Sequence, residues 1–161
     1  MTNELDTMLD GLIRKEKALS EILAITENQQ TVIKSSLPLD ESRKMVFEMN
    51  QAKQEAIRTV KDCDNMFEAI LKRIGKELEQ TQHLYADKVR LMQAHIRRIM
   101  DMDVKIRATE EENNRLLDAR REDDAKETET KPAASRKLGP KVSMPTNTAQ
   151  IIEAYKKGQE L

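Results

Sequence analysis

The chain has 161 residues, of which 38% are hydrophobic, 2% aromatic and 35% charged, with a formal net charge of −1. This charge balance gives no field that would attract nucleic acid or an anionic membrane. Ordinary globular domains are roughly 45–50% apolar, and this chain has no tryptophan. The composition therefore excludes a large compact core and favours an elongated bundle of amphipathic helices.

The first predicted helix covers about residues 3–35. Its apolar residues recur at multiples of seven, as in Leu5, Leu12, Leu19 and Ile33. Asn3 is a good N-cap, and Pro38 ends the helix because proline disfavours helical geometry in the residue before it.

The second predicted helix covers about residues 41–74, with Asp40 placed to cap it. Its apolar stripe runs from Val46 to Ile74. Two helices of equal length joined by a short loop are typical of an antiparallel hairpin.

The apolar spacing continues beyond Gly75 as far as Ile106, with polar Thr81 and Gln82 interrupting it. Two alternatives remain open: a break near 75–82 followed by a third helix, or one unbroken rod over 41–118. In either case the prediction is an all-α fold, a hairpin plus a third long helix. Residues 1–118 would form this three-helix bundle or coiled-coil rod.

The character of the sequence changes after Leu117, where apolar periodicity ends. We predict a flexible linker over 119–145, because residues 132–148 hold three of the four prolines and show no core pattern. A short amphipathic motif follows over 146–161. The expected tail is therefore disordered except where this motif meets a partner.

No residue pattern predicts chemistry at a site. His83 and His95 have no further ligand at metal-binding spacing, and the acidic runs at 110–112 and 122–124 lack the spacing of a calcium loop. Cys63 lies in the apolar stripe, where a thiol behaves as a small hydrophobe. We expect no catalytic residue, no metal and no cofactor, and hence no enzyme.

Methionines are frequent on the third helix, at Met92, Met100 and Met102. Filling of a bundle core is the ordinary interpretation of such residues. The competing interpretation is that the third helix keeps apolar surface for a partner helix, because the first two helices already pair in the hairpin.

The first helix segment LDGLIRKEKALSEILAITENQQTVIKSS and the start of the second, DESRKMVFEMNQAKQEAI, resemble the FlgN-type flagellar export chaperones. The resemblance covers about residues 3–118. It implies a cytoplasmic protein that binds the helical C-terminal segments of hook-filament junction proteins and delivers them to the flagellar export gate.

The resemblance also implies two sets of site residues. The client surface would consist of Tyr85, Val89, Met92, Ile96, Ile99 and Met100. The residues docking at the export gate would be Ile151, Ile152 and Tyr155. The partners would be hook-associated proteins and the export gate, with neither nucleic acid nor membrane insertion, and the chain would be a monomer or weak dimer.

Two other functions compete with this interpretation. The chain could be a structural coiled-coil protein whose apolar stripe serves self-association. It could instead be another motility or secretion accessory, such as a regulator of an export ATPase, although rods of that kind are commonly richer in basic residues than this near-neutral chain.

Overall fold

The structure is a computed structural model that describes residues 1–127. It contains helix α1 (Thr2–Ile33), helix α2 (Leu39–Thr81), the 3-10 helix η1 (Gln82–Tyr85) and helix α3 (Ala86–Glu127), and no strand lies within this range. The all-α prediction is confirmed. The expected disordered tail and the 146–161 motif lie outside the described residues.

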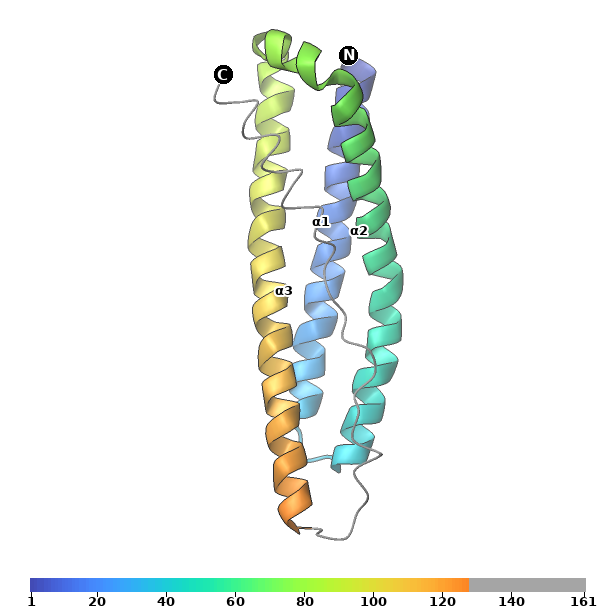
Figure 1. Cartoon of the computed structure of the whole chain (residues 1–161), viewed down its shortest axis with the longest axis vertical. Coiled ribbons are helices and arrows are strands. Elements are labelled where there is room, and N and C mark those ends of the chain that lie inside the picture. Colours follow the sequence, from blue (N-terminus) through green and yellow to red (C-terminus); the bar gives the residue numbers. More distant parts are fainter. Residues whose placement is uncertain (128–161) are drawn as a thin grey trace.

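The three long helices form an elongated bundle in which α1 and α2 are antiparallel while α1 and α3 run in the same direction (Figure 1). Helix α1 packs along both of the others, whereas the backbones of α2 and α3 approach each other at few points. At about 1.5 Å per residue, the 42 residues of α3 extend over roughly 63 Å. The first helix is therefore the central one.

Both predicted helix starts differ slightly from the structure. Helix α1 begins at Thr2, so Asn3 is not its cap, and the amino group of Met1 forms an ion pair with Glu4 at 2.8 Å. Helix α2 begins at Leu39 after Pro38, whose ψ of 146° keeps it outside the helix. Asp40 thus lies in the first turn, where its charge still favours the helix N-terminus.

Helix α3 continues through the boundary expected at 118, so residues 119–127 are helical and do not belong to a linker. Apolar periodicity is not needed here because polar contacts hold the helix. Arg120 donates hydrogen bonds to the carbonyl oxygens of Ile33 at 2.9 Å and Leu37 at 2.6 Å, and to Ser42 Oγ at 3.0 Å. This end of α3 is therefore fastened to the α1–α2 loop.

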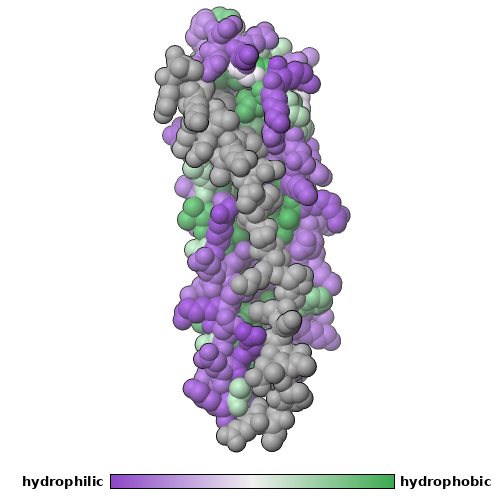
Figure 2. All heavy atoms as spheres, in the orientation of Figure 1, coloured by the Kyte–Doolittle hydropathy of each residue, from purple (hydrophilic) through white to green (hydrophobic). Residues whose placement is uncertain are grey.

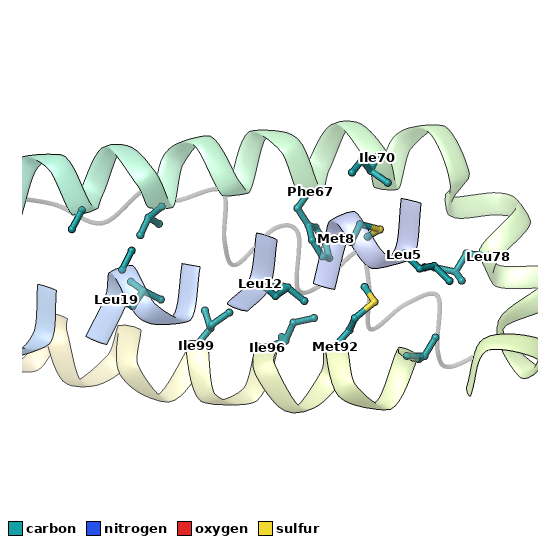
Figure 3. Packing of buried hydrophobic residues seen from close by; sticks show 14 of the residues in the cluster. Leu5, Met8, Leu12, Leu19, Phe67, Ile70, Leu78, Met92, Ile96 and Ile99 are labelled. Atoms are coloured by element: carbon teal, nitrogen blue, oxygen red, sulfur yellow. The ribbon is translucent and has the colours of Figure 1, made fainter. Parts of the chain in front are cut away.

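The core runs along α1, where α1 packs against the other two helices. Leu5, Met8 and Leu19 are completely buried, and Phe67 of α2 and Met92 of α3 point toward α1 from opposite sides (Figure 3). Each fully buried aliphatic side chain contributes about 1.5–3 kcal/mol. Hydrophilic side chains cover most of the described surface seen in Figure 2.

The open alternative between a rod and a broken helix is settled in favour of the break. Helix α2 ends at Thr81, inside the 75–82 region, and η1 then connects it to α3. Figure 1 shows the chain turning over the end of the bundle at this point. The bundle is consequently closed at two corners, one between α1 and α2 and one between α2 and α3.

Candidate partner-binding surface

The six residues expected on a client surface are Tyr85 of η1 and five residues of α3, and all of them belong to the core cluster or pack against it. Four of them are in the core, and Tyr85 and Met100 are half-buried against it. The four buried residues, which we call the α3 seam, are Val89, Met92, Ile96 and Ile99.

These four residues thus fill the bundle core, which is the ordinary interpretation of such residues, while Leu91 and Val104 of α3 remain exposed. The reason is that the apolar residues of α1 pack against α3 as well as against α2. Met8 and Leu12 lie between the two flanking helices (Figure 3), so α1 can bury the α3 seam as well as the apolar face of α2.

The large hydrophobic side chains that are exposed belong to a different set. They are Ile13, Met45, Phe47, Leu84, Leu91 and Val104. Exposed apolar residues that stand singly are normal on proteins. Leu84 and Leu91 stand out because they lie at and just after the second corner, 67% and 52% exposed.

Polar contacts at the rim of the α1–α3 interface fix the position of α3. Lys88 Nζ lies 2.6 Å from Asp6 Oδ1, and Glu16 accepts contacts from His95 at 2.5 Å and Arg98 at 2.6 Å. Desolvation alone would raise the pKa of Glu16, but the hydrogen bonds from Arg98 and His95 outweigh it and lower that pKa. His95 is thus partly buried at this interface, with its side chain 17% exposed.

Two ion pairs are buried inside the bundle. Lys15 of α1 pairs with Asp64 of α2, and Lys53 of α2 lies 3.5 Å from Glu110 of α3. Burial lowers the pKa of both lysines and raises that of Glu110, even though each partner's charge acts in the opposite sense. Desolvation therefore exceeds the attraction of the partner.

A third polar group lies further along α1. Gln29 donates hydrogen bonds to the Val46 carbonyl oxygen at 3.1 Å and to Asn50 Oδ1 at 2.7 Å. Asn113 of α3 donates to the Thr26 carbonyl oxygen at 3.0 Å, while its buried Oδ1 has no hydrogen-bond partner among the described residues. Because buried polar groups are costly unless paired, this part of the α1–α3 interface is the least well satisfied.

The described residues offer little for metal or thiol chemistry. Within 1–127 no three His, Cys, Asp or Glu side chains gather in a way that would hold a metal ion. Cys63 is buried, as predicted, and burial raises the pKa of its thiol. No helix in this range has a stretch long and apolar enough to cross a bilayer.

Sequence reasoning missed the buried ion pairs that join the helices. Lys15 and Lys53 interrupt apolar stripes at core spacing, which was the available signal. The acid that pairs with each one lies on another helix, and no sequence pattern identifies it.

Comparisons with protein-family models, with curated proteins and with solved structures give no significant match to this chain. The gate-docking residues Ile151, Ile152 and Tyr155 lie outside the described residues. The described residues that bear on function are therefore those between α1 and α3.

Proposed function

We propose that this protein is a cytoplasmic, non-enzymatic export chaperone that binds an amphipathic helix from the C-terminal segment of a hook-associated protein. The client would pack on the α3 seam when α3 leaves α1. The observation that supports this most is that the backbone of α3 packs mainly along α1 and approaches that of α2 at few points.

An exchange of helices keeps the energetic cost of this binding small. When the α3 seam moves from α1 to a client helix, the apolar face of the client becomes buried and that of α1 becomes exposed. The total buried apolar surface therefore changes little. The net free energy is then a difference between two similar interfaces. That difference suits a chaperone, which must release its client at the export gate.

The buried polar groups that join α3 to the other two helices favour opening of the bundle. Asn113 leaves one buried atom unpaired, and the Lys53–Glu110 pair joins α2 to α3 at the cost of desolvating both charges. Neither feature adds the stability that apolar residues would give. The 146–161 motif, with Tyr155, would then dock the loaded chaperone at the gate.

Calorimetric titration with C-terminal fragments of hook-associated proteins tests the proposal. A saturable 1:1 complex is the expected result, with a heat-capacity change near zero, because the exchange uncovers about as much apolar surface on α1 as it buries on the client. An absence of binding with every such fragment would reject this function.

A matched pair of variants tests the surface itself. Met100 is half-buried at the edge of the core, whereas Val104, one turn further along α3, is 67% exposed. We expect Met100→Glu to weaken client binding at least about tenfold, in line with the loss of one interface contact, and Val104→Glu to leave it unchanged. Equal affinities in two folded variants would contradict the placement of the client on this face.

A crosslink tests whether α3 must leave α1. Cysteines replacing Asp6 and Lys88, whose side chains touch across the interface, can be joined by a short bis-maleimide in a Cys63→Ala background. The closed, crosslinked protein should not bind client, and the uncrosslinked protein should. Undiminished binding by the crosslinked form would show that release of α3 is unnecessary.

A further inference from the structure

The two corners of the bundle are built differently. At the first, Pro38 forbids a continuous helix, and Arg120 bonds to the carbonyl oxygens of Ile33 and Leu37. Ser35 Oγ also bonds to the Val32 carbonyl oxygen at 2.6 Å. The sequence and the side chains together make this corner permanent.

The second corner lacks both the proline and the arginine. Residues 76–86 contain neither proline nor glycine, and η1 has no side-chain hydrogen bond at its N-cap, Thr81. The Thr81 hydroxyl instead donates back to the Glu77 carbonyl oxygen at 2.7 Å, within α2, so it does not bridge the corner. Thr81, with φ −119° and ψ 9°, departs from helical values, while Gln82 and Ala86 are in the right-handed helical region. A 3-10 segment between two α-helices is a typical place for a hinge.

The apolar spacing continues in phase through this corner. Leu78, Tyr85 and Met92 are separated by seven residues each, so in a straight helix they would lie on nearly one face. Leu84 and Leu91 share the same spacing and are exposed in the closed bundle. The sequence of the corner thus suits a continuous helix as well as it suits the turn.

Straightening the corner would carry α3 away from α1 as one unit. Its partner surface on α1 includes Asp6, Glu16 and the core residues between them. A second copy of this chain, opened in the same way, offers that identical surface. Every contact of α3 with α1 can then be restored between chains.

We propose that the chain forms a domain-swapped dimer in which α2, η1 and α3 join into one helix and each α3 packs on α1 of the other copy. The dimer needs no client and is independent of the proposed function. The two straightened corners add a surface that the closed monomer lacks, on which Leu84 and Leu91 of the two copies become available to each other.

Mixing two singly substituted chains tests the swap directly. In a Cys63→Ala background, one tagged chain carries Asp6→Cys and a differently tagged chain carries Lys88→Cys. The two are unfolded, mixed, refolded at high concentration and treated with a short bis-maleimide. We expect a crosslinked product carrying both tags, of twice the 18.6 kDa chain mass. The control, a chain with both cysteines in dilute solution, should crosslink within itself.

Two corner variants should shift the population in opposite directions. Gln82 is the first residue of η1 and its φ of −57° matches the value that proline imposes, so Gln82→Pro fits the closed corner. In a continuous helix the proline would break it, so we expect the dimer dissociation constant to rise at least about a hundredfold. Thr81→Ala, which favours helix, should lower it.

Light scattering across a range of concentrations measures both shifts, with circular dichroism confirming that each variant is folded. A protein that is monomeric after refolding at every concentration would overturn the proposal. So would a dimer that yields no product with both tags, or one whose dissociation constant neither corner variant changes.

Discussion

Replacing Lys53 by methionine and Glu110 by leucine together should raise the free energy of unfolding by about 1–4 kcal/mol, the range found when apolar residues replace a buried ion pair. Lys53 is 1% exposed and the Glu110 side chain 18% exposed. The pair therefore sits inside the bundle, where apolar side chains of similar volume can pack against α2 and α3.

The magnitude follows from two opposing effects. At 3.5 Å, opposite unit charges attract by about 5 kcal/mol at an effective dielectric constant near 20. The pKa of Lys53 is nonetheless lowered and that of Glu110 raised, in each case mainly by burial. Desolvation of the two ions thus exceeds their attraction, and removing both charges relieves it.

The single variants should behave in the opposite way. Lys53→Met alone leaves the Glu110 carboxylate without its cation, and we expect a loss of about 3 kcal/mol, at the lower end for a broken buried pair because Glu110 retains some contact with water. Urea denaturation followed by circular dichroism at pH 7 measures both the double variant and Lys53→Met. A double variant less stable than the parent would refute the reasoning.

The pH dependence gives an independent check on the same pair. The folded-state pKa of Glu110 lies above its ordinary value of 4.5, so between these two pKa values the folded state binds more protons than the unfolded state. Stability therefore falls as the pH rises from 4.5 to the folded-state pKa. The folded-state pKa of Lys53 lies below 10.5, so stability rises as pH increases toward that value. The double variant should lack both slopes.

Three further predictions concern other parts of the bundle. Arg120→Ala should lower the free energy of unfolding by about 1.5–3 kcal/mol because it breaks hydrogen bonds to the first corner, whereas Arg115→Ala, which removes an exposed pair, should have no measurable effect in the same urea titration. Gly75→Ala should stabilise the protein by about 0.5–1 kcal/mol, since an added Cβ meets nothing within 4 Å; Gly11→Ala should gain less in thermal melts, because its Cβ would come within 2.5 Å of the Met66 methyl group. Cys63, which is buried with a raised thiol pKa, should react with a thiol reagent only as fast as the bundle opens, and rapid reaction of the folded protein would contradict its placement in the core.

The helical fold could be predicted from sequence because it depends on local spacing. The apolar repeat of Leu5, Leu12 and Leu19 and the proline at 38 predicted the first helix and its end to within a few residues. The end of α3 was missed because Arg120 holds it by hydrogen bonds to carbonyl oxygens, and backbone groups leave no mark in a sequence.

The interface residues show where such prediction ends. Met92 and Ile99 were correctly placed on one face of the third helix, but whether that face is covered depends on how much apolar surface α1 offers to two neighbours at once. Glu110 belongs to an acidic run whose spacing predicts no site, yet it is half-buried beside Lys53, on a different helix. Such pairings depend on the relative register of helices, which spacing within one helix does not determine.

The parallel arrangement of α1 and α3 has a consequence for the order in which the chain folds. Helix α1 can pair with α2 through a short corner, but its contacts with α3, such as those of Thr26 with Asn113 and Ile33 with Arg120, join residues 87 positions apart. Local pairings form sooner than distant ones because less chain entropy is lost in closing the loop. During synthesis the α1–α2 hairpin therefore forms first, and one side of α1 stays uncovered until the last turns of α3 have left the ribosome.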